Sequence, residues 1–232
     1  MSRGRGDTAE RVLRGPVLWT GITLLTLFAL GPFLWVFLTS LKTRADLYAT
    51  PLRYLPVELT AANYADAWTS KLTPFSRFFA NSLWVSSVTM VATTGVSILA
   101  GYALARFRFA GRNALLLVFL ATQMFPAVLL IAPLLSQWYA LGLIDTYQAL
   151  IYSNLSFTVP FTVWMLVGYF DAIPRDLEES ALIDGCGRFG ALCRIVLPLA
   201  APGIAATAIF AFVTSWSELL FAITFTTQTE MR

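Results

Sequence analysis

The chain of 232 residues is 57% hydrophobic and only 12% charged, about half the charged fraction of an ordinary soluble domain. This composition, with apolar stretches of about 20 residues, indicates an integral membrane protein, and the lack of alternating ~10-residue segments favours helices over a β-barrel. The formal net charge of +3 comes without a basic patch interleaved with aromatic residues, so the sequence gives no sign of a nucleic-acid partner.

Residue types that carry catalysis or bind metals are scarce. The sequence has no histidine, which excludes Ser-His-Asp and Cys-His catalysis and the commonest metal ligand. Its two cysteines, Cys186 and Cys193, match neither a CxxC nor a zinc pattern, and no GxxxxGK[ST] loop occurs. We therefore expect no enzyme activity, no metal site and no nucleotide bound by this chain itself.

The N-terminal third combines a basic segment, one apolar run and a polar connector. Residues 1–16 are polar and basic, and the apolar run 17–41 lacks an A-x-A cleavage site, so we predict a retained first transmembrane helix. The segment 42–77 is too polar to span a membrane. It is either an extended cap with one short helix at Ala61–Trp68, capped by Thr60, or a solvated connector.

The remainder, residues 78–232, predicts four further spans. They are expected at 78–105, 114–135, 149–170 and 202–225. Prolines lie in or near several spans, where neighbouring helices or water can satisfy the freed carbonyl groups, and they indicate kinks: Pro32, Pro126, Pro133 and Pro160.

The distribution of lysine and arginine predicts the orientation. If the N-terminus is cytoplasmic, ten of these cations lie inside and six outside. The contrast is sharpest between the short loops, with three arginines in 105–113 and no cation in 136–148. The polar loop 171–200 is therefore expected on the cytoplasmic side.

That loop contains the signals of two short helices. Pro174 suits a first helical position, acidic residues follow it in the first turns, and Gly185 stands where a left-handed cap would end the helix. A second amphipathic turn follows, and Pro198 is expected to block its continuation into the next span. From the residues alone, the loop either packs beneath its own bundle or docks a partner, with Ala181 allowing close approach and Leu182, Ile183 and Phe189 as apolar anchors.

A spacing within the loop distinguishes these readings. The pattern E-x-A-x-x-x-G, nine residues, then I-x-L-P resembles the signature loop of binding-protein-dependent ABC importer permeases, with Ser180 in place of the usual alanine. The resemblance implies that the loop inserts into a cleft of an ATPase subunit and couples hydrolysis to helix motion. The residues that carry this implied role are Glu179, Ser180, Ala181, Asp184, Gly185, Ile195, Leu197 and Pro198.

Further motifs are similar to those of the carbohydrate-uptake branch, specifically the second permease of the maltose type. They include the run Gly101–Arg106 and the pair Trp216 and Glu218. The resemblance implies an all-α type I ABC importer bundle in the plasma or inner membrane of a prokaryote. Such permeases usually have six spans, so a sixth is expected but absent beside the five visible here.

The implied partners are a homologous permease that completes the translocation path and an ABC ATPase dimer that holds ATP and magnesium. An extracytoplasmic solute-binding protein, a sugar and membrane lipid complete the set. Two alternatives stay open: a permease for another polar solute such as glycerol-3-phosphate, and a membrane assembly scaffold without transport. The position of every arginine outside the predicted spans favours a neutral sugar.

Few residues are candidates for substrate contact. Glu218 is the only acid predicted inside a span, where it either faces the path or pairs with another helix. Ser153 and Asn154, with Ser156 and Thr158, either contact sugar or bond helix to helix. Trp164 and Trp216 either stack on a pyranose ring or mark a membrane interface.

Overall fold

The computed structural model describes residues 6–70 and 74–227, with side chains from residue 15 onward. Within these ranges the chain is helical, and its only β-type pairing is an isolated bridge between Lys42 and Leu59. It forms two compact units, residues 1–75 and 76–232, and each is described by itself. Among the described residues, four helices are long and apolar enough to cross a membrane, and a bent helix pair makes a fifth candidate.

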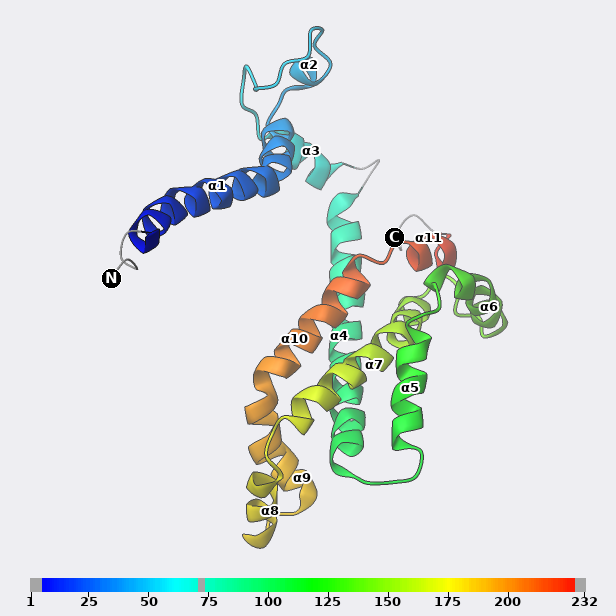
Figure 1. Cartoon of the computed structure of the whole chain (residues 1–232). Helices are drawn as coiled ribbons and strands as arrows, with labels where there is room; N and C mark the ends of the chain where they lie inside the picture. Colours follow the sequence, from blue (N-terminus) through cyan, green and yellow to red (C-terminus); the bar gives the residue numbers. More distant parts are fainter. Residues whose placement is uncertain (1–5, 71–73, 228–232) are drawn as a thin grey trace. The chain divides into compact units, whose positions relative to one another are not determined.

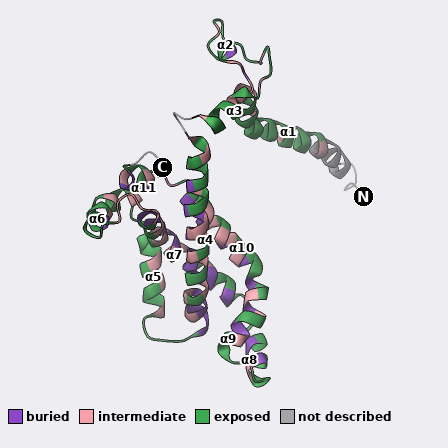
Figure 2. Ribbon diagram, turned by 180° about the vertical axis from the view of Figure 1, so that it is seen from behind, coloured by how far each residue is buried: buried purple, intermediate pink, exposed green. Residues whose placement is uncertain are grey.

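The first unit contains α1 (Gly6–Ser40), α2 (Arg44–Leu47) and α3 (Ala62–Thr69). Most residues of α1 from residue 15 onward are exposed, as the green colour of its ribbon in Figure 2 shows. The predicted short helix is confirmed as α3, which begins at Ala62, and Thr60 Oγ1 accepts a hydrogen bond from Ala62 N at 3.1 Å. The even shorter α2 was not predicted.

The connector between α1 and α3 is folded around buried polar groups. Asp46 accepts hydrogen bonds from Arg53 Nη1 at 2.7 Å and from Val57 N at 3.0 Å. The Arg53 hydrogen bond, followed by the Val57 amide, holds the pKa of Asp46 below its ordinary value. Asn63 Nδ2 donates to the carbonyl groups of Ser40 and Lys42 at 2.9 and 2.8 Å. These bonds favour the folded cap over a freely solvated connector.

The second unit is a helical bundle with short elements at both ends (Figure 1). Its long helices are α4 (Phe75–Arg106), α7 (Tyr147–Asp171) and α10 (Leu197–Trp216), accompanied by α5 (Arg112–Thr122). At one end lie α6 (Ala127–Ala140) and α11 (Leu220–Phe225). At the opposite end lie α8 (Arg175–Ile183) and α9 (Arg188–Ala191).

Two predicted spans differ from the structure. The span predicted at 114–135 falls on α5 and α6, which together make one candidate span but are separated by a short break and bent by 95°. Pro126 caps α6 and disfavours a helical conformation at the residue before it, which explains the break. The bounds predicted as 202–225 are wrong, because α10 begins at Leu197 and ends at Trp216 before the separate α11.

Small residues allow the long helices to approach closely. An added Cβ at Gly101 of α4 would lie 3.1 Å from Leu166 Cβ of α7, and one at Gly203 of α10 would lie 2.4 Å from Tyr169 Cγ of α7. Hydroxyl pairs join α4 to α7, with Thr93 2.9 Å from Thr158 and Ser97 2.6 Å from Thr162. Close packing and hydroxyl bonds are the contacts that hold helices together where the surroundings are apolar.

Candidate functional site

The polar loop after α7 folds as the sequence predicts in its first half. Helix α8 begins after Pro174 and ends before Gly185, whose φ of +87° is the left-handed conformation that glycine adopts without strain. Cys186 N donates to Ala181 O at 3.0 Å and Gly185 N to Leu182 O at 3.2 Å, the bond pair of a Schellman cap. The helix end predicted at Gly185 is therefore confirmed. Pro174 is the N-cap of α8, one position before the first helical position that was expected for it.

The second half of the loop differs from the prediction. A π-helical turn, η1 (Leu192–Val196), follows α9 directly and continues without a break into α10. Leu197 N donates to Leu192 O, five residues earlier, which makes the turn wider than an α-helical turn. The wider turn accommodates the ring of Pro198, which has no N–H to donate. The expectation that Pro198 blocks this continuation is wrong.

The loop exposes apolar side chains at the end of the bundle. Leu177 is 45% exposed, Ile183 86% and Phe189 71%. Glu179, Ser180, Asp184, Gly185 and Pro198 are exposed on the same loop, whereas Ile195 and Leu197 are half-buried. Ala181 instead is buried, and its predicted role in close approach by another surface stays a prediction. Exposed apolar side chains on a polar loop indicate an interaction surface for another molecule.

One buried acid connects this loop to α4. Glu178 Oε2 accepts from Arg106 Nε at 2.8 Å, and Glu178 Oε1 accepts from the hydroxyl of Tyr102. Sequence reasoning missed this pair. Its only signal is that Tyr102 and Arg106 are four residues apart on one helical face, within the run Gly101–Arg106.

Main-chain carbonyls strengthen the same connection. Arg106 Nη2 donates to Ile173 O at 3.1 Å, and Arg175 Nη2 donates to Ala105 O at 2.8 Å. Beside them, Arg112 Nη2 pairs with Asp171 Oδ2 at 3.1 Å, and Arg112 Nε donates to Leu104 O. The last turn of α4 is thus bonded both to the start of the loop and to α8.

A small polar cavity lies near the other end of the bundle. Its volume is about 50 Å³, enough for a few water molecules but not for a sugar ring. Three predicted path residues, Asn154, Trp216 and Glu218, line it together. The other polar lining residues are Asn81, Ser82, Ser86 and Ser215.

Two of the predicted path residues make structural hydrogen bonds. Glu218 lies in the break between α10 and α11, not inside a continuous span, and accepts hydrogen bonds from Leu220 N at 2.9 Å and Phe221 N at 2.8 Å. Asn154 Nδ2 donates to Leu150 O at 3.0 Å. Ser215 Oγ, in contrast, is buried without a hydrogen-bond partner among the residues that the structure describes, and it borders the cavity.

Two predicted path residues lie outside this cavity lining. Ser153 is buried and accepts a hydrogen bond from Trp138 Nε1 at 2.9 Å, which bonds α6 to α7. Trp164 is stacked on Phe161, with ring centroids 6.0 Å apart. The structure therefore does not bring these two residues together with the other three.

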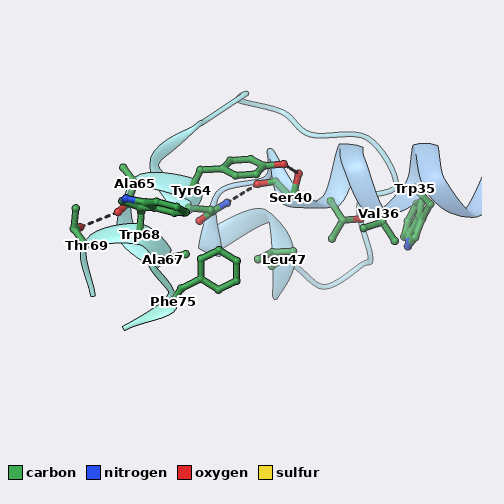
Figure 3. Close-up of a pocket in the computed structure, with 12 residues that line it drawn as sticks. Trp35, Val36, Ser40, Leu47, Tyr64, Ala65, Ala67, Trp68, Thr69 and Phe75 are labelled. Atoms are coloured by element: carbon green, nitrogen blue, oxygen red, sulfur yellow. Dashed lines mark hydrogen bonds between the residues drawn. The ribbon is translucent and has the colours of Figure 1, made fainter. Parts of the chain in front are cut away.

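The first unit has a wide apolar groove of about 1130 Å³ (Figure 3). The end of α1 contributes Trp35 and Val36, and α3 contributes Tyr64 and Trp68. Two of its polar side chains bond to each other, since the hydroxyls of Ser40 and Tyr64 lie 2.5 Å apart. The described residues that line the groove form no cluster of metal ligands.

Metal ligands do not cluster in the part of the chain that the structure describes: no group of three or more Cys, Asp or Glu side chains could hold an ion.

Known proteins match this chain over most of its length. A family described as "Binding-protein-dependent transport system inner membrane component" matches residues 96–231. The sulfoquinovosyl glycerol transport system permease protein SmoH of Agrobacterium fabrum is 39% identical over 94% of this chain and 75% of its own length. The trehalose/maltose transport system permease protein MalG of Thermococcus litoralis is 34% identical over 96% of this chain and 80% of its own.

A solved structure has the same fold. It is a chain of a bacterial ABC transporter involved in the import of the acidic polysaccharide alginate. The match has a TM-score of 0.80 at 24% identity and covers all of this chain and 78% of the other.

Proposed function

We propose a transport function from the premise that this chain belongs to the family of binding-protein-dependent transport system inner membrane components. Members of this family are translocation subunits, not enzymes, and work with other components of ABC transporters. The chain is accordingly a multi-pass membrane protein of an ABC importer. Its docking surface, orientation, cargo and individual partners are the subject of the proposal.

The loop after α7 is proposed to dock an ATPase subunit. The observation that carries this is the exposure of Leu177, Ile183 and Phe189 on an otherwise polar loop at one end of the bundle. Desolvating such side chains favours association, and the exposed Glu179 and Asp184 beside them supply polar complementarity. ATP and Mg²⁺ would bind to the partner ATPase dimer, since this chain has no phosphate-binding loop motif.

The loop is proposed to face the cytoplasm, which places the N-terminus on the same side. The support is the excess of arginine in the segments that then lie inside. A homologous permease would complete the path, and an extracytoplasmic solute-binding protein would deliver the cargo to the opposite side.

The proposed cargo is a sugar. Relatives that are 34–39% identical carry names for transport of sulfoquinovosyl glycerol, trehalose/maltose and diacetylchitobiose. In this chain the polar cavity is lined by amide, hydroxyl and carboxylate groups beside Trp216, which suits hydroxyl-rich ligands. None of the described residues that line it is lysine or arginine, which disfavours a phosphate such as glycerol-3-phosphate. Since the cavity now admits only water, sugar passage requires the helices to separate.

Site-directed cross-linking tests the docking surface. In a chain with Cys186→Ser and Cys193→Ser, the variant Ile183→Cys should cross-link to the co-expressed ATPase subunit. Val91→Cys, which is exposed on α4 away from the loop, is the matched control and should not. If Ile183→Cys and Phe189→Cys both fail to reach the ATPase in an assembled complex, the docking proposal is wrong.

A further inference from the structure

The geometry points to Glu178 and Arg106 as positioning residues that join α8 to α4, so that the docking loop and α4 move as one body. This inference rests on the proposed function, because it concerns how displacement of the loop reaches the bundle. Along the chain, the loop connects α7 to α10 and is not directly joined to α4. Noncovalent contacts are therefore required for α4 to follow the loop.

The pair is built as a rigid connection. The side chains of Arg106 and Glu178 are only 3% and 7% exposed, and the Nε–Oε2 distance is 2.8 Å. The second carboxylate oxygen accepts from the Tyr102 hydroxyl, so both oxygens of Glu178 are bonded to α4. A planar guanidinium that is bonded at two nitrogens cannot rotate without breaking a bond.

The surrounding contacts hold the same two elements. Arg106 also bonds Ile173 O before α8, and Arg175 of α8 bonds back to Ala105 O of α4. The aromatic ring of Tyr102 packs edge-on against Phe170 at the end of α7, with centroids 6.4 Å apart. Three positions near the end of α4, Tyr102, Ala105 and Arg106, therefore contact the loop or its root. Displacement of α8 alone would break their bonds to Glu178 and Arg175.

A purely stabilising role does not explain the choice of residues. Buried ion pairs contribute little net stability compared with apolar residues of the same volume, and their best-attested use is to specify one geometry. The buried bond between the hydroxyls of Ser97 and Thr162, 2.6 Å apart, also joins α4 to α7 but involves no residue of the loop. It therefore provides a matched control.

The functional test uses the complete complex in proteoliposomes. The measured quantity is sugar taken up per ATP hydrolysed, with trehalose, maltose, sulfoquinovosyl glycerol and diacetylchitobiose as probes. Glu178→Gln should lower this ratio by about two- to thirtyfold, the range found for changes along coupled networks. Ser97→Ala should leave it within about twofold. The swap Arg106→Glu with Glu178→Arg should recover coupling relative to Arg106→Glu alone.

A distance measurement separates positioning from stability. Spin labels are attached through Leu99→Cys on α4 and Asp176→Cys on α8, in a chain whose native cysteines are serine. The distance between them should be the same without nucleotide and with a non-hydrolysable ATP analogue. In Glu178→Gln it should differ between the two states.

Either of two results overturns the inference. One is a wild-type label distance that changes with nucleotide, and the other is an unchanged uptake ratio in Glu178→Gln at normal assembly. Failure of the wild-type complex to take up any probe would instead count against the proposed sugar function, so the two failures are distinguishable.

Discussion

The contact between Gly203 of α10 and Tyr169 of α7 gives the sharpest prediction about the bundle. In Gly203→Ala the new methyl group would lie 2.4 to 2.7 Å from three ring atoms of Tyr169. These atoms are the base of the ring, Cγ and both Cδ atoms, so a small tilt of the ring does not relieve the contact. Overpacking of this kind costs about 1–3 kcal/mol. Alanine recovers about 0.5–1 kcal/mol of helix propensity, which leaves a net loss of about 1 kcal/mol.

Thermal unfolding of the detergent-solubilised chain measures this loss. Gly95→Ala is the matched control, because that helical glycine has nothing within 4 Å of an added Cβ and should be neutral or slightly stabilising. Tyr169→Ala should remove most of the penalty when combined with Gly203→Ala. Equal midpoints for Gly203→Ala and Gly95→Ala would refute the packing of α10 on α7 described here.

Three further changes test other parts of the account. Gly185→Ala places a side chain at φ +87°, costs about 1–2 kcal/mol, and should speed hydrogen exchange of the Cys186 amide. Thr158→Val removes the bond to Thr93 and should destabilise the bundle by about 0.6 kcal/mol, seen in the same thermal assay. The pKa of Asp46 is lowered in the fold, so its stabilisation is complete above the unfolded pKa of about 3.9 and is lost as the pH falls through the folded value. Protection of the Val57 amide should therefore decrease in acid, and Asp46→Asn should abolish that pH dependence.

Local signals in the sequence predict local structure well. Gly185 before a second amphipathic turn predicts a left-handed cap, and the cap forms because its determinants lie within five residues of one another. The position of α3 is confirmed for the same reason. At Pro126 the signal was present, but hydropathy alone cannot separate a kinked span from two helices bent by 95°.

Long-range pairs leave no such signal. Glu178 and Arg106 are 72 positions apart in the sequence. In the sequence, Glu178 is one more acid in a polar loop, and only the folded chain places its carboxylate against Arg106 of α4. The π-helical turn before Pro198 accommodates the proline within a continuous helix, so proline rules predicted a break where the helix continues. The roles of Glu179, Asp184, Asn154 and Glu218 stay predictions, because each depends on a partner or a cargo.

The most direct test of the account is ATP-driven uptake by the reconstituted complex. Proteoliposomes that contain this chain, its partner permease and the ATPase, supplied with the binding protein, should accumulate at least one of the four sugars when ATP is present. Glu178→Gln should hydrolyse ATP with reduced accumulation. Uptake that is absent for all sugars, or that proceeds equally without ATP, would contradict the account.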